Sequence, residues 1–185
     1  MILINSLGLS HEYAQRTVRP GETAVDATCG KGRDTLFLSK LVGDIGTVFA
    51  FDIQIESVEL TRSLLETHKI TNTVVFNEGH EKMDELVPGG VSCIMFNLGF
   101  LPGTNHLVQT KGETTVDAIG KAMKLIKPGG IITIVIYQGG DTGYEERDMV
   151  LDYCGKVNQK EFTVMKSSFI NQKNNPPIFI CIEKL

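Results

Sequence analysis

The sequence predicts an α/β fold with a seven-stranded, mostly parallel sheet, an antiparallel edge strand and helices on both faces. Apolar strand-like runs alternate with helical patterns from one end of the chain to the other. The run 131–136 is continuously apolar, which indicates a central strand covered on both faces. The last two strand signals have no convincing helix between them, so we expect an edge hairpin and an antiparallel final strand.

The expected elements follow one another in alternating order. Strands are expected near 23–27, 46–52, 73–77, 91–97, 130–137, 160–168 and 177–183, and helices near 6–18, 33–42, 54–68, 113–126 and 143–156. The segment 127–130, Lys-Pro-Gly-Gly, ends one helix and begins the next strand. The segment 167–177 is polar and ends in two prolines, which suits the turn of the hairpin. No repeat or linker interrupts the pattern, so we expect residues 1–185 to form a single domain.

The composition is that of an ordinary globular protein. Of the 185 residues, 42% are hydrophobic and 22% charged, and no apolar run reaches membrane-spanning length. The four cysteines show no metal-ligand spacing, so we expect no metal site. Cys93 and Cys181 lie in apolar runs and are expected to be reduced core thiols of a cytoplasmic protein. The net charge of −4 counts against an extensive RNA-binding surface, because nucleic-acid binders usually carry a basic one.

The most informative stretch is 26–35, Asp-Ala-Thr-Cys-Gly-Lys-Gly-Arg-Asp-Thr, which links the first expected strand to a helix. Gly30 and Gly32 lack a Cβ, so the backbone can turn sharply and approach a ligand closely. The free amides at the start of the helix face that ligand. Asp52 ends the second strand, where a carboxylate can accept hydrogen bonds from two ribose hydroxyls. The unit predicts a nucleoside-cofactor site, and the alternative is an ordinary tight turn with incidental acids.

Two details favour S-adenosylmethionine over NAD as the cofactor. A dinucleotide fingerprint has a third glycine, and the residue at that position is Thr35. The carboxylate of Asp26 would repel a pyrophosphate, whereas it suits a ligand that carries an ammonium and a sulfonium. Seven strands with one antiparallel partner are also the architecture of the Rossmann-like class I methyltransferases, which is the fold that we expect.

Other strand ends should lie around the same ligand, because such folds bind ligands at the carboxyl ends of their strands. After the third strand, Gly79 allows close approach to the adenine and His80 can hydrogen-bond or stack. The alternative is that His80 is a surface histidine in a loop. After the fifth strand, Tyr137 either lines the acceptor pocket or caps the core with its hydroxyl in water.

The fourth strand ends in the segment 97–103, Asn-Leu-Gly-Phe-Leu-Pro-Gly, and an Asn-x-x-aromatic turn here is typical of enzymes that methylate amino groups. The side-chain oxygen of Asn97 can accept N–H hydrogen bonds and so aim the nitrogen lone pair at the methyl group. Phe100 can pack against a planar base or cover the methyl group. The alternative is a loop that serves only the fold. The polar segment 104–115 beside it is expected to be a lid that faces the substrate.

Together these motifs resemble the bacterial "putative rRNA methylase" family over nearly the whole chain. The resemblance is carried by residues 26–35, 52–54, 80–81, 97–103, 110–111, 114–115 and 175–177. Studied members of that family methylate the aminomethyl group of 5-aminomethyl-2-thiouridine at the tRNA wobble position. The resemblance implies a set of residues around the cofactor and places Asn97 with its loop at the reacting amine. The implied cofactor residues are Lys31, Gly32, Asp52, Gln54, Gly79 and His80.

The chain departs from the family pattern at several of these positions. Relatives often have Asn and His where Lys31 and Arg33 stand, and Ser where Gly79 stands. They often have a histidine pair where this chain has Gln-Gly-Gly at 138–140. If those histidines bind substrate or handle a proton, that role is absent or reassigned here.

We therefore expect an S-adenosylmethionine-dependent N-methyltransferase that acts on the aminomethyl group of a modified wobble uridine, with tRNA as its partner. The sequence shows no strong general base, so water or a loop group would take the proton. The alternatives are a small-molecule amine or hydroxyl methyltransferase, which the acidic charge favours, and an rRNA base methyltransferase. A non-catalytic cofactor-binding module and an NAD oxidoreductase are further rivals. No membrane partner is expected, and a homodimer is a hypothesis with Leu7, Leu9 and Tyr13 as its candidate interface.

Overall fold

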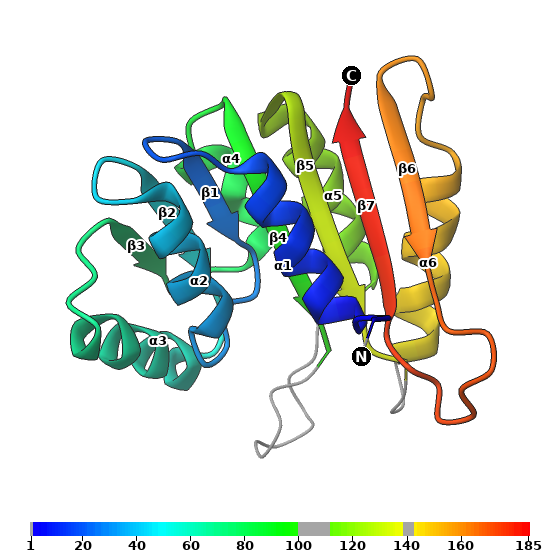
Figure 1. Ribbon diagram of the computed structural model, residues 1–185, viewed down its shortest axis with the longest axis horizontal. Helices are drawn as coiled ribbons and strands as arrows, with labels where there is room; N and C mark the ends of the chain where they lie inside the picture. The colour runs from blue at the N-terminus through cyan, green and yellow to red at the C-terminus, as the bar shows by residue number, and fades with distance from the viewer. Residues whose placement is uncertain (1, 100–111, 139–142) are drawn as a thin grey trace.

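The computed structural model describes residues 2–99, 112–138 and 143–185, and it confirms the predicted fold class. Seven strands form one sheet in the order β3-β2-β1-β4-β5-β7-β6 (Figure 1). β1 to β5 run parallel to one another. The strands are β1 (Thr23–Asp26), β2 (Thr47–Phe51), β3 (Thr73–Phe76), β4 (Val91–Leu98), β5 (Ile126–Ile136), β6 (Phe162–Ser167) and β7 (Ile178–Lys184).

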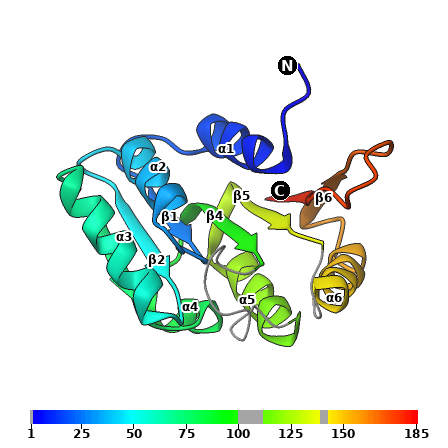
Figure 2. The same ribbon diagram turned by 90° about the horizontal axis from the view of Figure 1, so that it is seen from below.

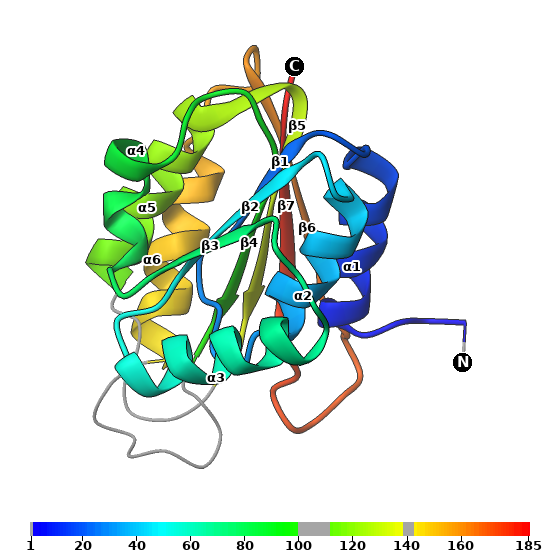
Figure 3. The same cartoon turned by 90° about the vertical axis from the view of Figure 1, so that its left-hand side faces the viewer.

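Helices cover both faces of this sheet (Figures 2 and 3). On one face lie α1 (Ser6–Thr17) and α2 (Arg33–Val42), which contact β1, β2, β4, β5 and β7. On the other face lie η1 (His80–Lys82), α4 (Met83–Leu86), α5 (Gly112–Leu125) and α6 (Gly143–Gly155). The remaining helix, α3 (Ile55–Thr67), packs against β3 and α2. No helix among the described residues is long and apolar enough to cross a membrane.

β5 shows why a central strand needs apolar side chains in both directions. Ile132, Ile134 and Ile136 belong to the buried cluster shared with α5 and α6, whereas Ile131 and Val135 belong to the cluster shared with α1 and α2. Successive side chains of a strand point to opposite faces, so a strand covered twice must be apolar at nearly every position. The continuous apolar run at 131–136 therefore predicted the position of this strand correctly.

The Lys-Pro-Gly-Gly segment at 127–130 lies within β5, because the strand begins at Ile126, directly after α5. Between the pairs Val91–Ile126 and Cys93–Ile131 the register shifts, so that the extra residues of β5 bulge out of the sheet. Gly129 has a φ of +74° in this bulge. The strand thus starts four residues before the position that the sequence indicated.

The last two strands form the expected hairpin at the sheet edge. β7 is antiparallel to both β5 and β6, and β6 is the outermost strand. The hairpin therefore inserts its second strand beside β5 and leaves its first strand at the edge. The short η1 and α4 were not predicted, since they are too brief to show a helical period.

Candidate cofactor and acceptor site

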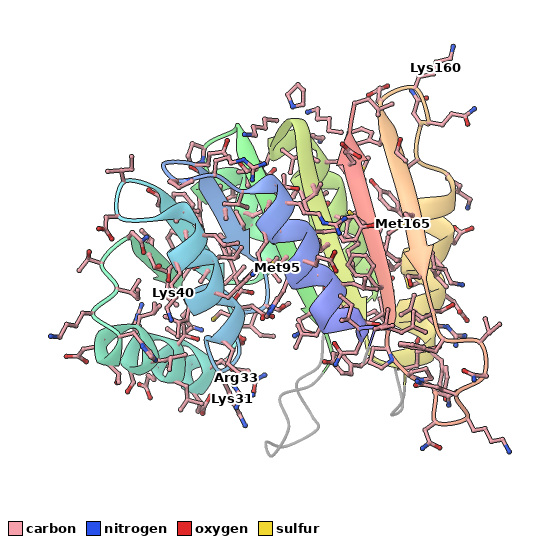
Figure 4. All side chains as sticks on the ribbon, viewed as in Figure 1. Lys31, Arg33, Lys40, Met95, Lys160 and Met165 are labelled. Carbon is pink, nitrogen blue, oxygen red and sulfur yellow. The ribbon has the colours of Figure 1, made fainter. Side chains whose placement is uncertain are left out.

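The candidate site lies at the carboxyl end of the parallel strands, which is the lower end of the molecule in Figure 1. The turn after β1, the end of β2, the loop after β3 and the ends of β4 and β5 meet there. Lys31 and Arg33 project at the same end, beside the start of α2 (Figure 4). Phe100 and residues 104–111 of the expected lid lie outside the described residues.

The glycine turn after β1 is held in a conformation that only glycine adopts readily. Gly30 and Gly32 have φ values of +51° and +76°. A Cβ on Gly32 would lie 2.9 Å from the Cα of Thr61 on α3, so the second glycine also permits close packing of α3. The Thr61 hydroxyl donates a 3.2 Å hydrogen bond to the carbonyl of Gly30. The turn is therefore a fixed cradle supported from behind by α3.

Asp26 is buried at the end of β1 beneath this cradle. Its carboxylate accepts hydrogen bonds from the Thr28 amide at 3.2 Å and from the Thr35 hydroxyl at 2.6 Å. Burial, together with the negative charge of Asp34, raises the pKa of Asp26 to about 7, and the two hydrogen bonds only partly oppose this. A buried carboxyl that holds its proton this strongly is suited to a cationic ligand, because a nearby positive charge favours its ionised form.

Asp52 joins the glycine turn to the end of β2. Its Oδ2 accepts a 3.0 Å hydrogen bond from the Gly30 amide, and its Oδ1 accepts a 2.9 Å hydrogen bond from the Gln54 amide. Each carboxylate oxygen can accept more than one hydrogen bond, so both retain capacity for ribose hydroxyls. The side chain of Asn77 donates to the carbonyls of Asp52 and Ile53, which fixes the end of β3 against the end of β2.

His80 lies inside the protein rather than on its surface. Its Nδ1 is 3.3 Å from the carbonyl oxygen of Ala27, which can only accept, so Nδ1 carries the proton of this hydrogen bond. The ring also packs edge-on against Phe96, with 5.7 Å between ring centroids. Burial lowers the pKa of His80, which keeps the ring neutral at pH 7. The ring thus holds the end of β1, and the backbone of the loop is left as the surface that could meet an adenine.

Gly79 precedes this histidine with an ordinary φ of −70°. A side chain at this position would meet the carboxylate of Glu81, which folds over the glycine. Because the φ is ordinary, the backbone conformation does not demand a glycine here. The Glu81 carboxylate is the far end of a flexible side chain, so it can move aside for a Cβ. The close approach that the sequence suggested for Gly79 stays a prediction.

Asn97, at the end of β4, has an unusual arrangement of hydrogen bonds. Its backbone amide donates to the Thr28 hydroxyl at 2.8 Å, which ties β4 to the glycine turn. Its Nδ2 donates to Oδ2 of Asp34 at 3.3 Å. Its Oδ1 is buried and has no hydrogen-bond partner among the described residues. An unpaired buried acceptor typically costs about 1–3 kcal/mol, so this oxygen is suited to receive an N–H or O–H from a ligand.

Asp34 and His11 are site residues to which the sequence assigned no role. Asp34 lies in the first turn of α2, and its Oδ1 is 2.7 Å from Nε2 of His11 on α1. The His11 ring stacks on Phe37, with 4.1 Å between ring centroids and 13° between ring planes. Asp34 was visible within the 26–35 motif, but no sequence spacing connects it to His11. Only the packing of α1 beside α2 brings the pair together.

Tyr137 follows β5, and its backbone amide donates a 3.2 Å hydrogen bond to the carbonyl of Leu98, the residue after Asn97. Its ring is about half-buried, and a Cβ on Gly99 would lie 3.5 Å from it. Burial raises the pKa of Tyr137, and the negative charge of Asp34 adds to this effect. Tyr137 therefore lies within the electrostatic reach of Asp34, on the acceptor side of the site, while 43% of its surface remains exposed. Both of its expected roles stay open.

The turn before β7 lies at the same end of the sheet, beside the end of β5. Gln138 donates from Nε2 to the carbonyl of Pro176 at 2.6 Å and accepts from Arg147 at 3.1 Å. Asn175 donates to the Tyr144 hydroxyl at 2.8 Å. Gln138, which stands where relatives often have histidine, therefore links β5 to α6 and the hairpin. The 175–177 segment therefore lies beside the end of β5.

These residues fit a ligand that is both a nucleoside and a cation. The glycine cradle lacks side chains that would fill it, Asp52 offers acceptors for a ribose, and Asp26 and Asp34 place negative charge beneath and beside the turn. That charge would oppose a pyrophosphate and would favour an ammonium or a sulfonium. Among the described residues, no group of His, Cys, Asp or Glu side chains could hold a metal ion.

Comparison with known proteins identifies the same family that the sequence motifs resemble. The model of a family described as "Putative rRNA methylase" matches residues 48–183. A relative from Arabidopsis thaliana, named tRNA (mnm(5)s(2)U34)-methyltransferase, chloroplastic, is 34% identical over 95% of this chain and 68% of its own length.

Solved structures extend this result to the fold and the cofactor. A crystal structure described as a putative rRNA-methylase from Clostridium thermocellum is 48% identical over the whole of both chains, with a TM-score of 0.98. A methyltransferase from Streptococcus mutans, solved in complex with S-adenosylhomocysteine (SAH), is 36% identical over the whole of both chains, with a TM-score of 0.92. The similarity therefore covers the entire chain, including the glycine turn.

Proposed function

Because the chain belongs to the "Putative rRNA methylase" family and is an S-adenosylmethionine-dependent methyltransferase, we propose that it methylates the aminomethyl group of a modified wobble uridine in tRNA. The observation that carries this proposal is the Oδ1 atom of Asn97, a buried acceptor without a partner among the described residues, at the end of β4. An N–H of an amine would satisfy it. The name of the Arabidopsis relative supplies the tRNA and the position of the uridine.

One set of residues binds the cofactor, and Asn97 orients the substrate amine. When bound, S-adenosylmethionine would supply the methyl group: the amine lone pair would form the new bond to the methyl carbon, the electrons of the broken C–S bond would stay on sulfur, and one proton would pass from the nitrogen to water. The turn at Gly30 and Gly32 and the carboxylate of Asp52 hold the nucleoside part. Asp26 offers negative charge to the cationic part. Asn97 accepts an N–H of the substrate, which orients the nitrogen lone pair.

An asparagine suits this role better than a carboxylate. An alkylamine must lose its proton before it can attack, and a carboxylate beside it would raise its pKa by favouring the ammonium form. The uncharged oxygen of Asn97 can accept an N–H without that penalty. Both oxygens of the Asp34 carboxylate are engaged by Asn97 Nδ2 and His11 Nε2, so the atom offered to the amine is the uncharged oxygen of Asn97.

The acidic net charge of −4 is the observation that favours a small-molecule acceptor instead. The proposed substrate needs only a local contact, because the wobble base lies in a loop that one end of the protein can approach. Lys31 and Arg33 are exposed at that end (Figure 4) and could face its phosphates. These two residues stand where relatives often have Asn and His, so the chain carries additional positive charge beside the proposed site.

Nucleoside mass spectrometry tests the proposal directly. Bulk tRNA whose modified uridine lacks the terminal methyl group is incubated with the protein and isotopically labelled S-adenosylmethionine. We expect one added methyl on the aminomethyl-modified uridine. Label entering rRNA only, or small amines only, would replace the proposed substrate while leaving the methyltransferase activity intact.

Asn97→Ala should slow methyl transfer to this tRNA while leaving cofactor binding largely unchanged. Removal of one oriented acceptor should lower kcat by about tenfold to a hundredfold, which corresponds to about 1.4–2.7 kcal/mol of activation free energy. Titration calorimetry with SAH measures cofactor binding separately. An unchanged kcat would remove Asn97 from the proposed role.

A further inference from the structure

A chain of hydrogen bonds links three elements that are far apart in the sequence. His11 of α1 contacts Asp34 of α2, and Asp34 accepts from the side chain of Asn97 at the end of β4. The distances are 2.7 Å from His11 Nε2 to Asp34 Oδ1 and 3.3 Å from Asn97 Nδ2 to Asp34 Oδ2. Both oxygens of the carboxylate are therefore used, one toward each neighbour.

The carboxylate of Asp34 decides which way the amide of Asn97 points. The oxygen and nitrogen of an asparagine amide have nearly the same shape, so packing alone does not choose between them. An ionised carboxylate can only accept, so it selects the NH2 group and turns Oδ1 away. That rotated oxygen is the buried acceptor without a partner among the described residues. The free acceptor at the end of β4 is thus a consequence of Asp34.

His11 in turn fixes the carboxylate. Its Nε2 must donate, because the oxygen that it meets can only accept. Its ring is stacked on Phe37, one helical turn after Asp34, which limits the positions that Nε2 can take. The side chain of Asp34 is 10% exposed and that of His11 is 30% exposed, so water competes little for the hydrogen bond. The helix start at Gly32 adds a favourable field for the charge of Asp34.

We propose that His11 and Asp34 are positioning residues that lock the side-chain amide of Asn97 with its oxygen toward the substrate amine. The inference rests on the proposed N-methylation and extends it to two residues that do not themselves touch the reacting atoms. Without the lock, the amide can rotate and present NH2, a donor, to an amine whose lone pair must remain free for the methyl group. A rotated amide would then hold the substrate by the lone pair that has to react.

Two substitutions of His11 separate the hydrogen bond from the packing. His11→Gln keeps a donor near the position of Nε2 but removes the ring, and His11→Phe keeps the ring stacked on Phe37 but removes the donor. We expect His11→Gln to retain kcat within about threefold and His11→Phe to lose about tenfold, equivalent to about 1.4 kcal/mol. KM for tRNA, and the dissociation constant of SAH measured by calorimetry, should change little in either variant.

Asp34→Asn is the second test of the proposed positioning role. An asparagine at this position can present either its oxygen or its nitrogen to Asn97, so the selection is lost while the volume is kept. We expect a loss of kcat at least as large as in His11→Phe. The side-chain NH2 resonances of Asn97, followed by NMR in the protein without RNA, should move in Asp34→Asn and His11→Phe and stay near the wild-type position in His11→Gln.

The outcomes distinguish this inference from the function on which it rests. If wild-type protein adds no methyl to tRNA, the proposed substrate is wrong, and the Asn97 resonances still report whether the lock exists. If wild-type protein is active and His11→Phe keeps full kcat while His11→Gln loses it, the ring matters only for packing and the inference is overturned. Equal losses of SAH affinity and melting temperature in all three variants would also overturn it, because they would indicate a structural role.

Discussion

The hydroxyl of Thr35 donates a 2.6 Å hydrogen bond to Oδ2 of Asp26, and both side chains are buried. Position 35 is where a dinucleotide-binding turn would have its third glycine. The residue that breaks the glycine pattern therefore supports the buried acid that distinguishes this site from a pyrophosphate cradle. A glycine at position 35 could not provide this donor, so the two departures from the dinucleotide pattern depend on each other.

Replacement of Thr35 by Val should destabilise the protein. The shape is kept, but Oδ2 of Asp26 loses its side-chain donor in a buried position, which should cost about 1–3 kcal/mol of unfolding free energy. Urea unfolding at pH 8, where Asp26 is mostly ionised, measures the effect. Thr35→Ser retains the hydroxyl and is the matched control. Equal losses in the two variants would assign the effect to the missing methyl group and not to the hydrogen bond.

The raised pKa of Asp26 predicts a pH dependence of stability in the cofactor-free protein. The pKa is about 7 in the folded protein, whereas an aspartate in an unfolded chain has a pKa of about 3.9. The folded state therefore binds the proton more tightly, and stability falls as the pH rises from about 4 through about 7. Between pH 5 and pH 8 the contribution of this group should fall by on the order of 2–3 kcal/mol.

Asp26→Asn should remove that dependence, because the amide stays neutral and its oxygen can still accept from Thr28. Melting temperatures of wild type and variant, measured without cofactor from pH 5 to pH 8, should diverge as the pH rises, with wild type falling relative to Asp26→Asn. Parallel curves would show that Asp26 does not titrate in this interval. The variant should also bind SAH more weakly than wild type at pH 8, since it lacks the negative charge.

The fold was predictable because its signals are long and repeated. The position of β5 as a central strand was indicated by a continuous apolar run, and that run fills both faces of the sheet. Gly30, Gly32 and Asp52 were predictable as a group, because strand, turn and helix form one local unit whose chemistry can be recognised. The Asp52 carboxylate indeed lies 3.0 Å from the Gly30 amide.

The contacts that the sequence missed depend on tertiary packing. His11 and Asp34 are 23 residues apart and meet because α1 and α2 lie side by side on one face of the sheet (Figures 1 and 2). The ring of His80 turns inward to the Ala27 carbonyl, and no local pattern indicates which way a loop histidine points. Its expected place beside the cofactor stays a prediction. Leu9 and Tyr13, proposed for a homodimer interface, pack against the buried cluster of their own chain. The homodimer stays a prediction.

Gly32→Ala should lower the stability of the protein by more than the positive φ alone explains. A non-glycine residue in the left-handed region costs about 1–2 kcal/mol, and at Gly32 a Cβ would also lie 2.9 Å from the Thr61 backbone. Gly129 has nearly the same φ, +74°, and a Cβ there would have no other atom within 4 Å. Gly129→Ala is therefore the matched control, in which only the backbone conformation is unfavourable. We expect a larger loss of urea stability in Gly32→Ala, with weaker SAH binding; equal losses would mean that α3 adjusts freely.

Asp52→Ala should chiefly weaken cofactor binding. The carboxylate organises the glycine turn through the Gly30 amide and, as proposed, accepts from the ribose. Loss of charge-assisted hydrogen bonds worth about 1.5–3 kcal/mol should raise the dissociation constant of SAH by about tenfold to a hundredfold. Asp44→Ala, an exposed aspartate in the loop before β2 at the opposite end of that strand, controls for loss of one negative charge. Calorimetry that gave equal affinities for the two variants would show that Asp52 acts only through net charge, and its place at the ribose would have to be abandoned.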